Sequence, residues 1–525
     1  MKRSLCLFIL AVAAGLCSVL FVLWAVDREK DGITVTETVI EGDIAAAEGI
    51  SVEIGTHWQG RLLWSTVYQP GHVQEAESSF DFTGQKIRWD YGNQAGGVSS
   101  FTSSGEIGGW RDRSTSYVDL DIVSTNFGTS SASGGNDRGV NIENMPWPRV
   151  LQAAAEQTGA GETRTVNLRV RDYYEYYPLE LSVSSVSGTL YLRSEAADFV
   201  TQYFKFPIPE DESFRVTIRK DWDGEVAELD CHSAGEGYFP WTVSARGNAG
   251  DWFSFYLEGE NKNLEQVQGE YGGQYAVYWL PHKNKEKMPG LDLENMTVAA
   301  QLPKDALPVT MRYDNERRIL YLLTVQKGRY ILLTYLDNDG ELAPLQQIEI
   351  LDMSDGAAIS AAEGGNGNGF VPAFRKMSIQ EDGILLTWQD NSFAFIARDG
   401  EGYRFWCAGI FPAKERDTGI LEEKLAEGAY FGSESAFPYE NAFAFDGTRL
   451  AIAAFEDWLS LDSRLVVYRE GELAYSGCYR YSGELDRELS GMYDEILPWG
   501  GNIKGRRRDG AAVGPVRVSI EPAIP

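Results

Sequence analysis

The 525-residue sequence predicts an all-β fold built from short antiparallel strands. Aromatic residues make up 12% of the chain and 55 residues are glycine, a composition typical of many strands joined by tight turns. In the second half, similar groups of apolar runs and glycine turns recur about every 60 residues. Long stretches with the 3.6-residue apolar period of a helix are scarce.

The clearest unit of this repeat runs from Asn441 to Tyr479 and contains four apolar runs. The turn Asp446-Gly447 separates the first two runs, and Glu470-Gly471 separates the last two. Glycine supplies the positive φ that tight hairpin turns require. We therefore expect a four-stranded antiparallel sheet with its strands in sequence order.

Two units upstream follow the same plan, one with turns at Asp382-Gly383 and Asp399-Gly400, the other with turns at Gly328 and Asp339-Gly340. The first turns of the three units, the last at Gly447, are 55 and 64 residues apart. Strands such as LAIAAF and ILLTW are apolar on both faces. A sheet stacked between two neighbouring sheets requires this pattern.

Weaker matches to the unit lie elsewhere. We predict three strands between Trp241 and Leu280 and three more between Ile50 and Tyr91. The turn at 221–225 has the same DxDGE pattern as the turn at 337–341. The C-terminal run PVRVSIEP is predicted as a final strand that pairs with an N-terminal strand.

A repeat of about 60 residues, each unit a four-stranded antiparallel meander, resembles the blades of β-propellers over roughly Phe206 to Tyr481. The resemblance implies a propeller of about seven blades. It carries no WD40, kelch or sialidase signature and therefore implies no site residues. The alternative architecture is a β-sandwich over residues 31–215 beside a smaller propeller.

An apolar segment precedes the strands. Residues 5–26 contain no charge and are long enough to cross a hydrocarbon layer of about 30 Å as a helix. Lys2 and Arg3 precede this segment, which predicts a single transmembrane helix with residues 1–4 in the cytoplasm. The alternative is a cleaved secretory peptide. We expect a juxtamembrane spacer over 27–45 and an extracytoplasmic domain over 46–525. This layout resembles uncharacterised membrane-anchored bacterial surface proteins.

Some segments do not fit a blade. Residues 127–160 are predicted as an insertion that contains a Ser/Gly-rich loop at 127–139 and a short helix at Pro148–Thr158. The helix has proline near its first turn and glycine after its end. A second short helix is predicted over Lys414–Glu427.

Charge and cysteine content limit the functions. The net charge of −30 gives a surface that repels nucleic acid, so we exclude nucleic-acid binding. Outside the apolar segment only Cys231, Cys407 and Cys478 remain, which is no disulfide scaffold and allows at most one bridge. The aromatic surroundings of Cys407 and Cys478 predict buried thiols.

No metal or cofactor site is predicted. The four histidines, His57, His72, His232 and His282, share no spacing that aims two of them at one metal, and Cys231-His232 are strand neighbours that point to opposite faces. No phosphate loop, GxSxG elbow or HExxH helix occurs. The two DxDGE turns bring carboxylates together as calcium sites do, but they lack EF-hand spacing, and turn chemistry explains them.

Two features are compatible with a glycan ligand. The first 110 residues contain four tryptophans suited either to stacking on sugar rings or to filling a core: Trp58, Trp64, Trp89 and Trp110. The basic cluster at 504–508 suits either a solvated loop or contact with an anionic cell-wall polymer.

We expect a membrane-anchored extracytoplasmic binding or scaffold protein whose partner is a protein or glycan at the cell surface, because propeller loops evolve binding without a catalytic signature. No catalytic residue can be assigned. A second hypothesis is a cell-envelope glycan hydrolase or lyase, which needs a pair of acids, or an acid with His57, His72 or His232. A third is an accessory subunit of a membrane complex.

Overall fold

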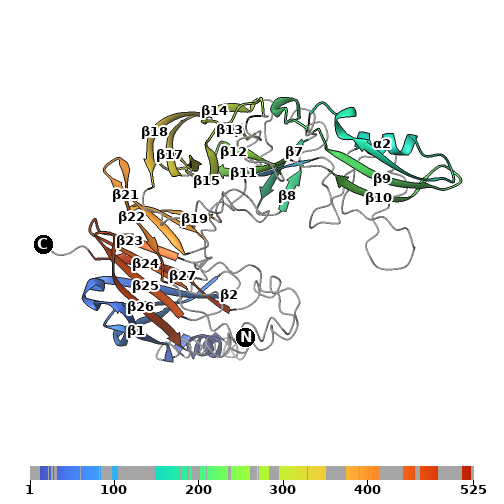
Figure 1. The fold of residues 1–525 in the computed structure, drawn as a ribbon. Helices are drawn as coiled ribbons and strands as arrows, with labels where there is room; N and C mark the ends of the chain where they lie inside the picture. Colours follow the sequence, from blue (N-terminus) through green and yellow to red (C-terminus); the bar gives the residue numbers. More distant parts are fainter. Residues whose placement is uncertain are drawn as a thin grey trace, which may run out of the picture. The chain divides into compact units, whose positions relative to one another are not determined.

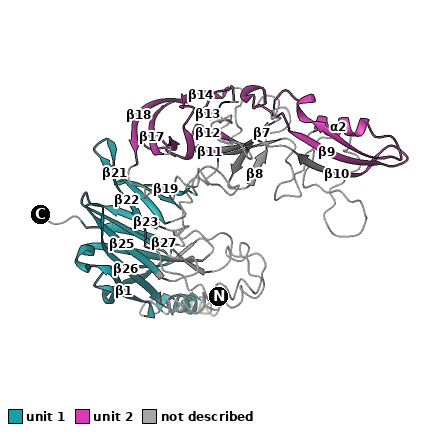
Figure 2. Cartoon of the chain, viewed as in Figure 1, with its two compact units in different colours: residues 1–90, 350–355, 373–525 teal, residues 91–349, 356–372 magenta. Residues whose placement is uncertain are grey.

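The computed structural model describes an all-β protein, and this confirms the predicted fold class (Figure 1). The strands of the described residues form seven antiparallel sheets, four of them four-stranded. The chain divides into two compact units, unit 1 (1–90, 350–355 and 373–525) and unit 2 (91–349 and 356–372) (Figure 2). The described residues are 12–21, 23–24, 28, 32–58, 61–81, 83, 97–103, 148–176, 179–185, 188–191, 201–208, 210–234, 238–259, 269, 271–282, 295–327, 329–350, 374–388, 391–412, 441–455, 462–482 and 511–521.

Unit 1 contains two of the predicted repeat units as sheets with their strands in sequence order. The first consists of β19 (Phe374–Ile379), β20 (Gly383–Trp388), β21 (Ser392–Asp399) and β22 (Gly402–Ile410). The second consists of β23 (Asn441–Phe445), β24 (Arg449–Phe455), β25 (Asp462–Arg469) and β26 (Glu472–Ser482). A fifth strand, β1 (Thr34–Gly42), pairs antiparallel with β26, so the segment predicted as a spacer contains a strand.

The third sheet of unit 1 joins the two ends of the chain. Its order is β27-β2-β3-β4, and its strands are β27 (Ala511–Ile520), β2 (Ile50–Trp58), β3 (Arg61–Tyr68) and β4 (Glu77–Phe80). Two short 3-10 turns accompany it, η2 (Ile44–Ala47) and η3 (Val73–Glu75). Val516 of β27 lies opposite Ile54 of β2, which confirms the predicted pairing of the final strand with an N-terminal strand.

This pairing overturns the sandwich alternative for the N-terminal strands. Strands β1 to β4 belong to sheets completed by β26 and β27, so residues 34–80 are not part of a separate sandwich over 31–215. The physical reason is that their edge N–H and C=O groups find partners in the C-terminal strands. The strand predicted at 86–91 lies outside the described residues.

The middle sheet of unit 1 is buried on both faces. On β24, Leu450 and Ile452 pack in one cluster with Phe395 of β21, while the intervening Ala451 and Ala453 pack with strands of the β27-β2-β3-β4 sheet. Successive strand residues point to opposite faces, so an uninterrupted apolar run buries both sides. The doubly apolar strand predicted stacking between sheets, and this prediction is confirmed.

Unit 2 contains four sheets. Two are four-stranded and follow sequence order: β11 (Tyr238–Arg246), β12 (Gly250–Gly259), β13 (Ala276–Pro281) and β14 (Thr297–Gln301), then β15 (Leu307–Asp314), β16 (Ile319–Gln326), β17 (Arg329–Asn338) and β18 (Glu341–Glu349). Two are three-stranded, with orders β10-β9-β6 and β5-β7-β8: β5 (Gly97–Ser103), β6 (Thr163–Arg169), β7 (Leu179–Ser185), β8 (Gly188–Tyr191), β9 (Ser213–Lys220) and β10 (Val226–Ala234).

The predicted short helix is present as α2 (Pro148–Glu156). Its buried residues Val150, Leu151 and Ala154 recur at helical spacing and join a core cluster with Phe214 and Val216 of β9. A second cluster joins the β11–β14 sheet to the β15–β18 sheet through residues such as Trp252. The two four-stranded sheets of unit 2 therefore pack face to face, as stacked blades do.

The transmembrane helix predicted over residues 5–26 stays a prediction. Of the predicted span 5–26, residues 12–21 and 23–24 are described and helical, and the others lie outside the described residues. No helix within the described residues is both long and apolar enough to cross a membrane. The loop at 127–139, the helix predicted at 414–427 and the basic cluster at 504–508 also lie outside the described residues.

Candidate functional site

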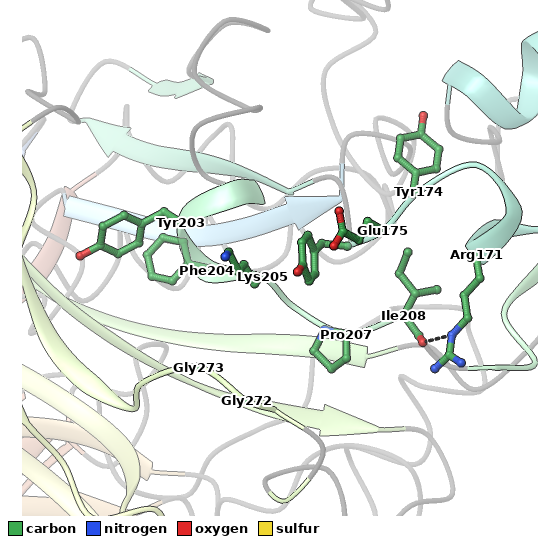
Figure 3. Close-up of a pocket in the computed structure, with 11 residues that line it drawn as sticks. Arg171, Tyr174, Glu175, Tyr203, Phe204, Lys205, Pro207, Ile208, Gly272 and Gly273 are labelled. Carbon is green, nitrogen blue, oxygen red and sulfur yellow. Dashed lines mark hydrogen bonds between the residues drawn. The ribbon is translucent and has the colours of Figure 1, made fainter.

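A pocket of about 520 Å³ opens in unit 2 between three segments of the chain (Figure 3). One segment is 171–176, which begins within the 3-10 turn η5 (Val170–Asp172) after β6. The second is 203–208, and the third is Gly272-Gly273. The residues that line it are Arg171, Tyr174, Glu175, Tyr176, Tyr203, Phe204, Lys205, Pro207, Ile208, Gly272 and Gly273.

The inner wall runs from the helical turn at 201–204 into residues 205–208, and its side chains alternate between core and solvent. Phe204, Phe206 and Ile208 are each about 2% exposed and belong to the core cluster, whereas Lys205 between the first two is exposed. The ring of Phe206 lies 5.0 Å from that of Phe255, a residue of β12. The two buried phenylalanines therefore anchor the backbone on either side of Lys205 and turn its side chain outward.

Arg171 ties the outer wall to the inner one. Its Nε donates to the carbonyl of Ile208 at 2.6 Å, as the dashed line in Figure 3 shows, and its Nη1 lies 3.2 Å from Glu210 Oε1. The Val170 N–H also donates to the carbonyl of Glu212 at 3.0 Å. Because both contacts join 170–171 to the chain beside β9, the width of the pocket is set by hydrogen bonds to the backbone.

Tyrosine rings form the faces of the pocket. Tyr203 is 38% exposed, and its ring packs edge-on against Tyr278 at 6.2 Å. Tyr174 accepts a hydrogen bond from the Arg149 N–H at 2.9 Å, and the Arg149 guanidinium lies 5.1 Å from the Tyr174 ring centre. Each ring is therefore supported on one side and is partly open on the other.

Tyr176 interacts with both Glu175 and Lys205. A hydrogen bond to Glu175 raises the pKa of Tyr176, because the bond favours the neutral phenol beside a carboxylate. The Lys205 ammonium lies 5.9 Å from the centre of the Tyr176 ring. Within the described residues, Lys205 has no carboxylate at salt-bridge distance. Among the described residues, the Lys205 ammonium is thus a cation without an ion-pair partner, in a protein of net charge −30.

A second polar cluster lies elsewhere in unit 2 and was not predicted. Asp251 is fully buried, and its Oδ1 lies 3.1 Å from both Arg246 Nε and His282 Nε2. The three residues sit at the end of β11, the start of β12 and the end of β13. Since the His282 side chain is only 8% exposed, the cluster is arranged to satisfy a buried carboxylate. Sequence spacing could not show this pairing, because Asp251 and His282 are joined through the sheet.

The two DxDGE turns use their carboxylates locally. Asp221 Oδ1 accepts from the backbone N–H of Glu225 at 2.9 Å, and Asp337 Oδ1 accepts from that of Gly340 at 2.9 Å. Tyr313 donates its hydroxyl to the other oxygen of Asp337 at 2.7 Å. Turn chemistry therefore accounts for these oxygens, as predicted. The described residues contain no group of three or more His, Cys, Asp or Glu placed to hold a metal ion.

Of the three histidines considered for hydrolysis, only His72 has a described side chain. His72 is exposed and its Nδ1 lies 4.0 Å from Glu75. His57 and His232 lie in β2 and β10, but their side chains are outside the described part of the structure. The contact between His72 and Glu75 lies on the exposed surface and outside the pocket of unit 2, and the hydrolase hypothesis stays a hypothesis for His57 and His232.

The structure tests the predictions for two of the cysteines and one of the tryptophans. Cys407 and Cys478 form no disulfide within the described residues. Cys407 is buried as predicted, and burial raises the pKa of its thiol to about 12, whereas Cys478 is only partly buried. Trp64 packs edge-on against Phe80 at 5.1 Å, which favours a core role over sugar stacking. The side chains of Cys231, Trp58, Trp89 and Trp110 lie outside the described residues.

One signal for the pocket was present in the sequence. The run YFKFPI at 203–208 alternates apolar and other residues, and this pattern indicates the buried positions Phe204, Phe206 and Ile208. The period of two would predict a strand, whereas the structure has a helical turn at 201–204 followed by the left-handed Lys205. A second run upstream, RDYYEYY at 171–177, is rich in aromatic residues and contains four tyrosines. Neither run reveals that the two segments meet across a pocket.

Comparisons with known proteins find only distant likenesses among solved structures. No protein-family description matches the chain, and no curated protein matches it. Among solved structures, the periplasmic gluconolactonase of Pseudomonas aeruginosa is 11% identical with a TM-score of 0.28, and the match covers 83% of this chain and 99% of that one. The β-propeller domain of Cps50 (Swd1) from Myceliophteria thermophila is 10% identical with a TM-score of 0.22, over 61% of this chain and 87% of that one.

A protein from Lactobacillus plantarum is 13% identical with a TM-score of 0.24, and the match covers 51% of this chain and 62% of that one. Likenesses at these values carry no argument about activity. The propeller-like character of this chain is shown by its own repeated four-stranded antiparallel sheets. Fold and pocket together define the chain as an all-β, propeller-like protein with a tyrosine-lined pocket.

Proposed function

We propose that this protein is a binding module that holds a saccharide in the tyrosine-lined pocket of unit 2. The observation that carries the proposal is the set of three partly open tyrosine rings, Tyr174, Tyr176 and Tyr203, around an open pocket of about 520 Å³. This volume lies within the usual range of small-molecule sites, about 300–1,000 Å³.

The chemistry of the lining favours a sugar over a protein surface. Sugar rings present apolar C–H faces that pack on aromatic rings and hydroxyls that need polar partners. The pocket supplies both, since its tyrosine rings stand beside the polar groups of Arg171, Glu175 and Lys205. A protein partner would instead need a broad, flatter contact of about 800 Å² on each side.

Binding is favoured over hydrolysis because the described lining of the pocket contains one acid. Glycoside hydrolysis uses two carboxyl groups on either side of the scissile bond. Glu175 is the only acid in the described lining, and it is engaged by Tyr176. If the N-terminal segment anchors the chain as predicted, the ligand is a glycan at the cell surface. An accessory role in a membrane complex would be compatible with the same pocket.

The proposal is tested with uncharged trisaccharides as probes: maltotriose, cellotriose and chitotriose. Titration calorimetry on the full-length protein is expected to show binding of at least one at millimolar or lower concentration. Tyr203→Ala is expected to weaken that binding about tenfold by removing a stacking ring. Trp222→Ala is the matched control, because Trp222 is 88% exposed at the β9–β10 turn and does not line the pocket.

Chromatography of the probe after incubation separates binding from turnover. Intact trisaccharide supports the binding module, and cleaved products would support the hydrolase instead. Failure of all three probes to bind, or an equal loss in Tyr203→Ala and Trp222→Ala, would contradict the proposal.

A further inference from the structure

Lys205 has a backbone conformation that its side chain does not favour. Its φ is 51°, in the left-handed region that costs a residue with a Cβ about 1 kcal/mol or more. Six described non-glycine residues have positive φ, and the other five lie at turns that connect paired strands. Lys205 instead follows the helical turn at 201–204, where its N–H donates to the carbonyl of Thr201 at 3.0 Å.

Glycine is the residue that this position favours on structural grounds. A helical turn that ends in the left-handed conformation usually has glycine there, because glycine has no Cβ. The buried rings of Phe204 and Phe206 fix the backbone on both sides, so the conformation is imposed on Lys205. A lysine kept at a strained position inside a pocket indicates a use for its side chain.

We propose, building on the saccharide-binding function above, that the ligand is a sugar carrying a single anionic group and that Lys205 binds that group. The ammonium is exposed, lies 5.9 Å from the Tyr176 ring centre, and has no carboxylate partner within the described residues. A sugar stacked on the tyrosines would place a carboxylate or sulfate within reach of this charge. Carboxylates and sulfate esters share this chemistry.

The net charge of −30 does not oppose such a ligand. At physiological ionic strength, charges more than about 8 Å away are largely screened, so the charges of the pocket lining act on a small anion more strongly than the distant acidic residues do. A long polyanion would meet the acidic surface beyond the pocket and be repelled. The charge distribution therefore selects a short or terminal acidic sugar.

Three probes with the same ring test the inference: methyl β-glucoside, methyl β-glucuronide and methyl β-glucoside 6-sulfate. We expect one or both acidic probes to bind the full-length protein about tenfold more tightly than the neutral one. Preference for one acid over the other identifies the anionic group. Lys205→Gly is expected to weaken acidic binding about tenfold more than neutral binding, so that the acidic and neutral probes bind equally. Lys304→Gly, at an exposed position outside the pocket, is the control.

Stability separates loss of function from misfolding. Lys205→Gly relieves the strained φ, so its midpoint of thermal unfolding should be unchanged or raised by up to about 2 °C while the acid preference is lost. Equal binding of acidic and neutral probes, or an acid preference that survives in Lys205→Gly, would overturn this inference and leave the saccharide-binding function standing. No binding of any probe would overturn both.

Discussion

Tyr479 donates its hydroxyl to Glu37 Oε1 at 2.7 Å, although the two residues are 442 positions apart in the sequence. Tyr475 donates to the same oxygen at 2.9 Å, and the Gly71 N–H donates to the other oxygen at 2.9 Å. Both phenols are fully buried. Strand β1 is thereby fixed to β26 by side chains as well as by its backbone ladder.

We predict that Glu37→Ala destabilises the protein by about 2–4 kcal/mol. The substitution removes three hydrogen bonds to a charged acceptor and leaves buried phenols without that partner. Glu41→Ala, at an exposed position on the same strand, should change the free energy of unfolding by no more than about 0.5 kcal/mol. Urea denaturation of both variants measures the difference. Equal effects would show that the contacts of Glu37 contribute nothing.

The buried tyrosines predict a loss of stability in alkali. Burial raises the pKa of Tyr335 and of Tyr481 from 10.0 to about 12, because the phenolate would lose its hydration. Burial also raises the pKa of Tyr475 and Tyr479. The contribution of these tyrosines to the free energy of unfolding is fully present below about pH 10. Above it, the unfolded chain loses protons that the folded chain retains, so each group lowers stability by about 1.4 kcal/mol per pH unit until its folded pKa is reached.

Thermal unfolding followed at several pH values checks this prediction. The midpoint should fall as the pH rises from about 10 to about 12, and phenolate absorbance from the buried rings should appear together with unfolding. Gradual ionisation of all tyrosines near pH 10 in a protein that keeps its native circular dichroism would contradict it.

Local sequence predicted much of the strand pattern, because hairpin signals act over a few residues. Asp446-Gly447 and Glu470-Gly471 lie at the turns between β23 and β24 and between β25 and β26, as their chemistry requires. The doubly apolar β24 also predicted its burial on both faces. The fifth strand β1 was missed, since its partner is supplied from the other end of the chain and the segment itself is mostly exposed.

The pocket was harder to predict than the sheets. Its walls at 171–176 and 203–208 are joined by the hydrogen bond from Arg171 to the Ile208 carbonyl, and no sequence period records such a contact. The left-handed φ of Lys205 was likewise hidden, because the usual signal for that conformation is glycine. Composition and periodicity therefore predict the strands, but they do not predict contacts between segments that are far apart in the sequence.

We predict that Asp251→Ala destabilises the protein by about 3–5 kcal/mol. The substitution leaves Arg246 and the nearly buried His282 without their shared carboxylate, and removing one member of a buried charge cluster is costly. Asp305→Ala, at an exposed position before β15, should cost less than about 0.5 kcal/mol. Urea denaturation followed by tryptophan fluorescence measures both. A small loss in Asp251→Ala would show that the cluster contributes little to stability.

Neighbouring residues of β27 test the joining of the chain ends. Val516 is 6% exposed and lies opposite Ile54, whereas Arg517 is exposed and its Nη1 lies 3.4 Å from Glu53. Val516→Asp buries an unpaired carboxylate and should cost at least about 3 kcal/mol. Arg517→Asp loses a solvated ion pair on the opposite face and should cost about 1 kcal/mol or less. Because both variants place aspartate in the same strand, similar unfolding midpoints would show that β27 is not packed against β2 as described.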